Sequence, residues 1–90
     1  MATIRIPSTM RPLTRNQAEV MASGTTVREV LKDLDARYPG IGVKLLDEHG
    51  AVRRYVNVFL NDEDIRGLEA LDTPVKDVDR LTLIPAMAGG

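Results

Sequence analysis

The sequence predicts a single α+β domain in which a mixed sheet of about four or five strands packs against one main helix. Segments near both ends of the chain alternate apolar and polar residues with period two, which is typical of half-buried strands. One internal segment repeats apolar residues at helical spacing. Ninety residues leave room for one hydrophobic core, and one amphipathic helix can cover one face of a small sheet.

The first two strands are expected at residues 2–7 and 17–22. In the first strand Ile4 and Ile6 share one face, while the residues between them point to the other. The second strand alternates more weakly. The intervening residues are polar and include Pro12, so we expect a long turn that joins the two strands into a β-hairpin.

The main helix is predicted to begin at Val27. Thr26 and Glu29 have the spacing of a capping box. In that motif the Thr26 hydroxyl accepts a hydrogen bond from the Glu29 N–H, and the Glu29 carboxylate accepts one from the Thr26 N–H. The Pro39-Gly40 pair ends the helix. Its apolar residues recur at helical spacing, at Val27, Val30, Leu31, Leu34 and Tyr38.

The second half of the chain predicts two more strands. Residues 41–46 are expected to form a short helical turn, and the alternation over 53–60 predicts a strand. Residues 61–64 have the composition of a turn. Irregular apolar spacing over 65–78 predicts short turns or 3₁₀ segments, and 80–85 closes the fold as a strand. The order β-β-α-β-β fits the β-grasp fold, although periodicity alone also allows other α+β sheets.

The composition excludes several classes of function. With 12 basic and 13 acidic residues the net charge is −1, which gives no field to hold a phosphate backbone. We therefore expect no nucleic-acid partner. No stretch is long and apolar enough for a membrane span, and the first ten residues do not resemble a signal peptide. A cytoplasmic protein without a membrane partner is expected.

The chain has no cysteine and one histidine, which argues against chemistry of its own. A thiol nucleophile and a cysteine-based zinc site are excluded. His49 precedes Gly50 in what looks like a solvated turn, and scattered carboxylates do not complete a metal site around it. No nucleophile–histidine arrangement or glycine-rich phosphate loop is present. We expect no catalytic residue, no metal and no bound cofactor, and hence not an enzyme.

The C-terminal segment is the strongest candidate for chemistry. Pro85 ends the last strand because it has no N–H for the ladder, which predicts a domain at 1–85 and a flexible tail at 86–90. Five residues span at most about 17 Å. A Gly-Gly end leaves no side chain beside the α-carboxylate, so the tail can enter a narrow channel. That carboxylate is ionised at neutral pH and is a poor electrophile until it is activated, for example as an acyl-adenylate. The tail consists of Ala86, Met87, Ala88, Gly89 and Gly90.

Short motifs along nearly the whole chain are shared with one family. They are Ile4-Arg5-Ile6-Pro7, Arg11-Pro12, Ala22-Ser23-Gly24, Tyr38-Pro39-Gly40-Ile41, Val56-Asn57, Asn61-Asp62-Glu63-Asp64 and Pro85-Ala86-Met87-Ala88-Gly89-Gly90. Together they resemble the ubiquitin-like sulfur carriers of the MoaD/ThiS family. The fit is closest to the CysO-type carriers of thiocarboxylate-dependent cysteine synthesis.

The resemblance implies that an E1-like enzyme adenylates Gly90 with ATP. Gly90 would then become a thiocarboxylate that donates sulfide in the synthesis of cysteine or a sulfur-containing secondary metabolite. The implied partners are that E1-like adenylyltransferase/sulfurtransferase and a downstream sulfur-accepting synthase. Residues Pro85 to Gly89 would enter a partner's active site. Nothing follows Gly90, so no proteolytic unmasking is expected.

Three alternatives remain open at this point. The chain could be the small subunit of molybdopterin synthase, whose tail stays inserted in a large subunit. It could be a ubiquitin-like modifier that forms isopeptide bonds to lysines. A plain interaction domain with an incidental Gly-Gly end would keep its function after loss of both glycines.

A partner-docking patch is predicted beside the tail. The apolar residues expected to face the helix are Val56, Val58, Leu60, Leu81 and Leu83. Alternation then places Tyr55, Phe59 and Ile84 on the opposite, solvent-exposed face. An exposed apolar cluster next to a reactive terminus is a natural docking site. Arginines nearby in the sequence could steer an acidic partner, although such charges usually form a solvated surface; these are Arg53, Arg54 and Arg66.

Overall fold

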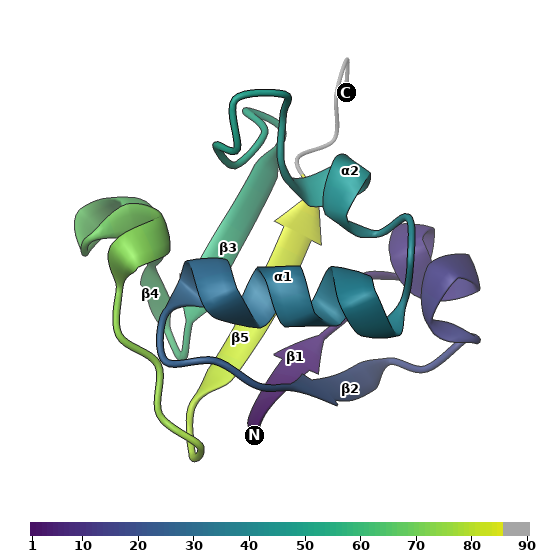
Figure 1. Cartoon of the computed structure of the whole chain (residues 1–90), viewed down its shortest axis with the longest axis horizontal. Coiled ribbons are helices and arrows are strands. Elements are labelled where there is room, and N and C mark those ends of the chain that lie inside the picture. Colours follow the sequence, from purple (N-terminus) through teal and green to yellow (C-terminus); the bar gives the residue numbers. More distant parts are fainter. Residues whose placement is uncertain (86–90) are drawn as a thin grey trace.

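The structure is a computed structural model that describes residues 1–85. Ten short elements follow one another along these residues (Figure 1). The strands are β1 (Ala2–Arg5), β2 (Glu19–Ala22), β3 (Val56–Leu60), β4 (Glu63–Asp64) and β5 (Arg80–Pro85). The α-helices are α1 (Val27–Arg37) and α2 (Gly42–Leu45), and the 3₁₀ helices are η1 (Ser8–Thr14), η2 (Ile65–Gly67) and η3 (Ala70–Asp72).

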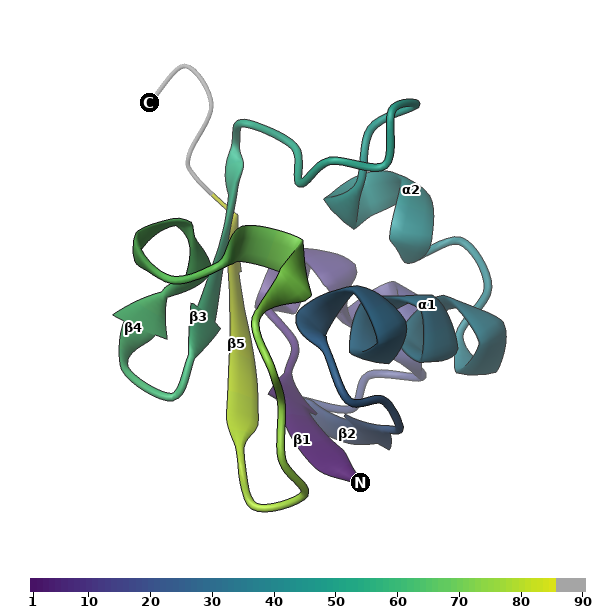
Figure 2. The ribbon, with the colours of Figure 1, turned by 60° about the vertical axis from the view of Figure 1, so that its left-hand side comes forward.

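The strands form one mixed five-stranded sheet in the order β2-β1-β5-β3-β4. Strands β1 and β5 run parallel, and the other neighbours are antiparallel. The last strand in the sequence is therefore the central strand of the sheet (Figure 2). The predicted α+β class, with one main helix against a mixed sheet, is confirmed.

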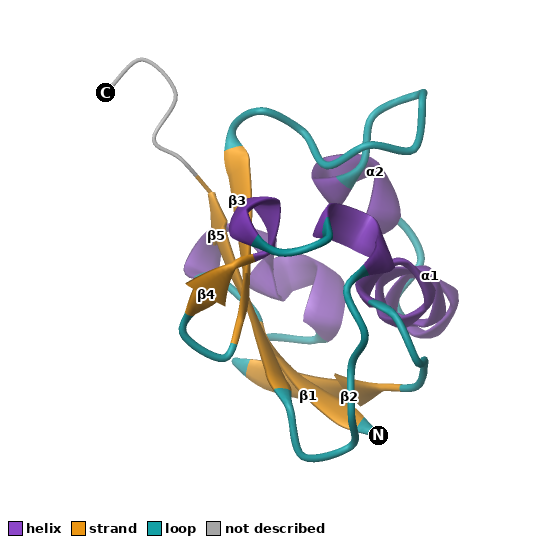
Figure 3. Cartoon of the chain, turned by 90° about the vertical axis from the view of Figure 1, so that its left-hand side faces the viewer, coloured by secondary structure: helices purple, strands orange, loops and turns teal. Residues whose placement is uncertain are grey.

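The hydrophobic core lies between α1 and one face of the sheet, and Figure 3 shows the helices gathered on that side. The alternation predicted for β1 is correct, because Ile4 and Ile6 are fully buried. The helix contributes its predicted stripe of apolar side chains. The main core residues are Val27, Val30, Leu31, Leu34, Val56, Val58, Leu81 and Leu83.

The N-terminus of α1 is capped nearly as predicted. The Thr26 hydroxyl accepts a hydrogen bond of 3.2 Å from the Glu29 N–H. The Glu29 carboxylate, however, bonds the N–H and the hydroxyl of Thr25 at 2.9 Å each, and not the Thr26 N–H. Thr25 offers two donors to the carboxylate, its N–H and its hydroxyl. That half of the predicted capping box is wrong by one residue.

Gly24 allows the chain to pass close behind the start of α1. Its φ is +157°, and a Cβ at this position would lie 2.6 Å from the backbone nitrogen of Val30. Real Cβ atoms do not approach backbone that closely, so the turn before the helix requires glycine.

The segment after β1 is more ordered than the predicted long turn. Residues Ser8–Thr14 form η1, and two of its side chains, Met10 and Thr14, are buried. Met10 joins the core. The Thr14 hydroxyl lies 2.9 Å from the Gln17 carbonyl, which ties the end of η1 to the residues before β2. The mostly polar composition concealed this element, since only Met10 and Leu13 of η1 contact the core.

Two boundaries in the second half differ from prediction. Strand β3 begins at Val56 and not at residue 53, because the Val56 N–H donates to the Arg53 carbonyl at 3.0 Å and closes a turn. The predicted turn at 61–64 contains the short strand β4. Asn61 has a φ of +57°, which Asn tolerates well, and the chain reverses tightly enough for Glu63 to pair with Leu60.

The remaining connections agree with the sequence. The predicted helical turn at 41–46 contains α2, and the region 65–78 contains η2 and η3, with an isolated bridge at Pro74 and no longer strand. Among residues 1–85 no helix is long and apolar enough to cross a membrane.

Candidate functional site

The candidate site is organised around Pro85, the last residue of the central strand. Pro85 pairs with Val56 of β3 and is half-buried. Strand β5 has a neighbour on each side, since β1 pairs with residues 80–82 and β3 pairs with residues 81–85. The chain beyond Pro85 therefore continues from the best-supported strand of the sheet.

The predicted tail residues lie outside the described part of the structure. They are Ala86, Met87, Ala88, Gly89 and Gly90. The roles predicted for them stay predictions from the sequence.

The predicted docking patch occupies the face of the sheet opposite α1. Ile84 pairs with Asn57, and Phe59 pairs with Thr82, so all four side chains belong to the same face. Ile84 is 42% exposed and Tyr55, in the turn before β3, is 43% exposed. The predicted orientation of this face is correct.

Phe59 is more covered than expected for a solvent-facing residue. Its exposure is intermediate, because it lies between Thr82 of β5 and Asp64 of β4. The sequence did not predict β4, and so it did not predict that Asp64 would lie beside Phe59. Asn57 and Thr82 lie on the same face beside the patch, as strand alternation indicates.

A charged cluster occupies the other half of the same face. The Glu19 carboxylate lies 3.3 Å from the Arg5 guanidinium and 3.7 Å from that of Arg80. These three residues come from β2, β1 and β5. The face is therefore divided into an ion-paired half near the first hairpin and an apolar half near β3.

Three arginines are connected with Val56, two because they precede it closely in the chain and one through a hydrogen bond. Arg66 donates from Nη2 to the Val56 carbonyl at 3.0 Å. Arg53 donates from Nε to the Val43 carbonyl at 2.7 Å, and it begins the turn that contains Arg54. Within residues 1–85 none of the three has a carboxylate within 4.0 Å. The sequence named all three arginines, and the fold adds the contact of Arg66 with the Val56 carbonyl.

Within residues 1–85, three carboxyl groups have a lowered pKa, and all three serve the scaffold. The backbone N–H of Thr25 lowers the pKa of Glu29, with help from the Thr25 hydroxyl. The Ser23 N–H lowers the pKa of Asp33, as does a hydrogen bond from Arg37. The N–H groups of Ala51 and His49 lower the pKa of Asp47. Each carboxylate fixes a turn, so these shifts point to local structure and not to acid–base chemistry.

His49 is a solvated turn residue, as predicted. Its side chain is 81% exposed and lies 3.7 Å from Glu48. In the described part of the chain no group of three or more His, Cys, Asp or Glu side chains is arranged to hold a metal ion.

The architecture defines a class of protein. A mixed five-stranded sheet that packs against one main helix, with the C-terminal strand at its centre, is the ubiquitin-like β-grasp fold. A solved structure of the Amycolatopsis orientalis BexX/CysO complex contains a chain with the same architecture. That chain matches with a TM-score of 0.93 and 41% identity, and the match covers 100% of both chains. The β-grasp prediction is confirmed.

The chain belongs to the ThiS family, whose family model matches residues 4–90. It is 44% identical to the sulfur carrier protein CysO of Mycobacterium tuberculosis over 90 residues, which cover 98% of this chain and 97% of that relative. It is also 35% identical to small archaeal modifier protein 3 of Haloferax volcanii over 65 residues, covering 72% of this chain and 70% of the relative. The prediction of a sulfur carrier, acted on by other enzymes and not itself an enzyme, is confirmed.

Proposed function

We propose that this chain carries sulfur as a thiocarboxylate on Gly90. The observation that supports this most directly is that the family match extends to residue 90 and so includes the terminal Gly-Gly pair. The fold adds physical support, because the segment that would react continues from Pro85 on the central strand. A rigid strand end fixes where the tail begins, and the glycines leave the acyl carbon unobstructed.

The proposed chemistry has two steps. A carboxylate oxygen of Gly90 attacks the α-phosphorus of ATP, and pyrophosphate leaves. Hydrosulfide or an equivalent sulfur nucleophile then attacks the acyl carbon, and AMP leaves with the pair of electrons of the broken C–O bond. The carboxylate needs this activation because it is ionised and unreactive at neutral pH.

The activating partner in this proposal is an E1-like adenylyltransferase/sulfurtransferase. The apolar half of the open sheet face, defined by Tyr55, Phe59 and Ile84, is its proposed docking patch. Ile84 precedes Pro85 directly, so a partner seated on the patch would have residues 85–89 at its active-site entrance. A CysO relative is present in the BexX/CysO complex, which supports partner binding by this kind of domain.

The proposed destination of the sulfur is cysteine or a sulfur-containing secondary metabolite, with a downstream synthase as acceptor. The similarity to CysO over nearly the full length favours this version. The proposal places the chain in the cytoplasm, where ATP is available to the activating enzyme. The chain itself needs no bound cofactor.

Intact-mass spectrometry of the protein from its native host tests the proposal. Replacing one carboxylate oxygen by sulfur adds about 16 Da, which follows from atomic masses for a terminal carboxyl. Fragmentation must place that increase on Gly90, since oxidation of a methionine gives the same increment. If the increment is found only on methionines under sulfur-replete growth, the proposal is wrong.

A second candidate function is protein modification, and the similarity to small archaeal modifier protein 3 favours it. In that case Gly90 would form isopeptide bonds to lysines of other proteins. Immunoblots would then show ladders that survive denaturation and thiol reductant. A sulfur carrier without conjugating activity shows a single band under the same conditions.

A further inference from the structure

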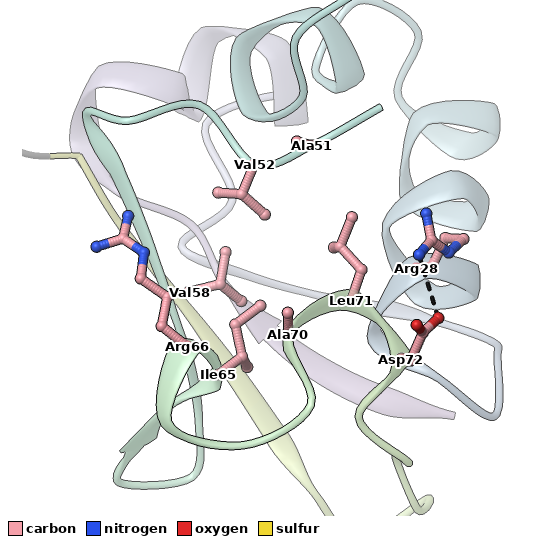
Figure 4. A pocket seen from close by; sticks show the side chains of 9 residues that line it. All are labelled: Arg28, Ala51, Val52, Val58, Ile65, Arg66, Ala70, Leu71 and Asp72. Carbon is pink, nitrogen blue, oxygen red and sulfur yellow. Dashed lines mark hydrogen bonds and ion pairs between the residues drawn. The ribbon is translucent and has the colours of Figure 1, made fainter. Parts of the chain in front are cut away.

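A cavity opens on the helix side of the sheet, between β3, η2, η3 and the start of α1. Its volume is about 280 Å³. Figure 4 shows an apolar centre with charged side chains at opposite rims. The apolar lining comes from Val52, Val58, Ile65 and Leu71. None of these residues belongs to the open-face docking patch.

One wall of the cavity is held in an unfavourable backbone conformation. Ala70 lines the cavity with a φ of +52°, a region that residues with a Cβ avoid. The Thr73 hydroxyl stabilises this turn, because it donates to the Ala70 carbonyl at 2.7 Å and accepts from the Glu69 N–H at 3.0 Å. Thr73 is buried. Strained positions that persist in this way are enriched at binding sites.

The rims of the cavity differ in their capacity to bind a ligand. On the α1 side, Arg28 and Asp72 neutralise each other in an ion pair of 3.1 Å. On the β3 side, Arg66 is exposed and uses Nη2 on the Val56 carbonyl. A guanidinium has five N–H donors, and within residues 1–85 no carboxylate lies within 4.0 Å of this one. Asp64, the nearest acid in sequence, already accepts the Arg66 backbone N–H.

We propose that this cavity receives one large apolar side chain from a partner protein, and that a neighbouring carboxylate of the same partner segment pairs with Arg66. The volume lies just below the range of roughly 300–1,000 Å³ that is usual for small-molecule sites, so one inserted side chain fits better than a cofactor. An apolar anchor beside a charge-assisted pair is also the usual composition of an interface hot spot.

The cavity adjoins the candidate site described above. Arg66 contacts Val56, and Val56 pairs with Pro85. A partner that holds the C-terminal end of the chain can therefore reach the cavity from the β3 edge. The inference goes beyond the proposed function, because it concerns binding and does not require a thiocarboxylate on Gly90.

Peptide titration of the ¹⁵N-labelled full chain tests the inference. Three probes are used: acetyl-Asp-Leu-Glu-amide, acetyl-Asp-Ala-Glu-amide and acetyl-Lys-Leu-Lys-amide. The first peptide is expected to give saturable shifts at the amides of Val52, Ile65 and Leu71. The alanine and lysine peptides are expected to bind at least about tenfold more weakly, since they lack the anchor or the carboxylates.

Two variants and one control locate the binding. Ala51 is exposed at the rim, and Ala51→Phe is expected to block the cavity without changing any charge. Arg66→Glu reverses the rim charge. Lys76→Glu makes the same change in net charge in an exposed loop that does not line the cavity.

Loss of the shifts in Ala51→Phe and Arg66→Glu, with wild-type binding in Lys76→Glu, supports the inference. Equal binding of all three peptides, shifts confined to the open sheet face, or no saturable shift at millimolar peptide overturns it. The spectra also show whether each variant is folded, so a misfolded Arg66→Glu leaves Ala51→Phe to decide.

Discussion

The guanidinium of Arg66 donates a hydrogen bond of 3.0 Å to the main-chain carbonyl of Val56. This contact spans the edge of β3 where β4 does not reach, because β4 pairs only with Phe59 and Leu60. An uncovered strand edge is open to pairing with another chain, and a charged side chain laid across it prevents this. Arg66 therefore protects the outer edge of the sheet beside the start of the C-terminal segment.

Arg66→Ala is expected to destabilise the domain by about 1 kcal/mol, the usual net contribution of one hydrogen bond. Urea unfolding measures the change. Arg54→Ala is the matched control, since Arg54 is exposed and makes no side-chain hydrogen bond among the described residues; it should stay within about 0.5 kcal/mol of wild type. Equal stability of the two variants would show that the Arg66 contact contributes nothing.

Gly24→Ala is expected to cost about 2 kcal/mol or more, because the new Cβ would lie 2.6 Å from the Val30 nitrogen at a φ of +157°. Gly67→Ala is the control, since no atom lies within 4 Å of a Cβ at that position. Thermal unfolding of both variants checks the prediction. A Gly24→Ala protein as stable as Gly67→Ala would mean that the turn before α1 relaxes freely.

Ile84→Asp is expected to reduce adenylation by the activating enzyme at least about tenfold, because it places a charge in the apolar docking patch. ATP–pyrophosphate exchange measures the effect. Val78→Asp is the matched control, since Val78 is 89% exposed and lies outside the patch. Phe59→Asp is a weaker test than Ile84→Asp, since Phe59 is partly buried beside Asp64 and the variant is expected to lose stability too. Undiminished exchange with Ile84→Asp would remove the patch from the docking surface.

Deletion of Gly89 and Gly90 is expected to abolish the mass increase of sulfur loading and to leave the melting temperature unchanged. The reason is that the hydrophobic core between α1 and the sheet is built from side chains of residues 2–83. Intact-mass spectrometry and thermal unfolding are run on the same preparation. Growth of the host on sulfate with only the truncated protein would contradict the carrier proposal.

Acid is expected to destabilise the domain through Glu29. Its folded pKa lies below the ordinary value of 4.5 because it accepts hydrogen bonds from Thr25. A carboxylate of this kind stabilises the fold above its unfolded pKa, and the stabilisation is lost as pH falls through the folded pKa. Glu29→Gln should therefore lower the melting temperature at neutral pH and flatten its fall as the solution is acidified.

Glu48→Gln is the control for this pH dependence. The Glu48 carboxylate is exposed and accepts no backbone N–H among the described residues. Its melting temperature at neutral pH should equal that of wild type. A Glu29→Gln profile that is parallel to wild type would show that the Thr25 contacts do not depend on charge.

The sequence predicted the elements whose signals are local. The α1 cap at Thr26 and the alternation of Ile4 and Ile6 each depend on residues within one turn or one strand. The 3₁₀ helix η1 and the strand β4 escaped prediction because tertiary contacts define them. Met10 reaches a core built elsewhere, and β4 exists only because β3 is already in place beside it.

The candidate site divides in the same way. Side-chain alternation predicted that Ile84 and Phe59 share one face of the sheet, and the strand pairing agrees. The approach of Arg66 to Val56 and the cavity behind β3 depend on how η2 and η3 fold back onto the sheet. No pattern along the sequence indicates that η2 and η3 fold back onto the sheet. The Arg66–Val56 contact and the cavity therefore could not be predicted from the sequence.

The parallel pairing of β1 and β5 has a mechanical consequence. The two terminal strands of the domain lie side by side and point in the same direction. Tension between the chain ends therefore loads their hydrogen bonds together along the strands, whereas a hairpin would release its bonds one at a time. A partner that pulls on the C-terminal end of the chain would load the β1–β5 hydrogen bonds first. Because these bonds must break together, the domain should stay folded under that force.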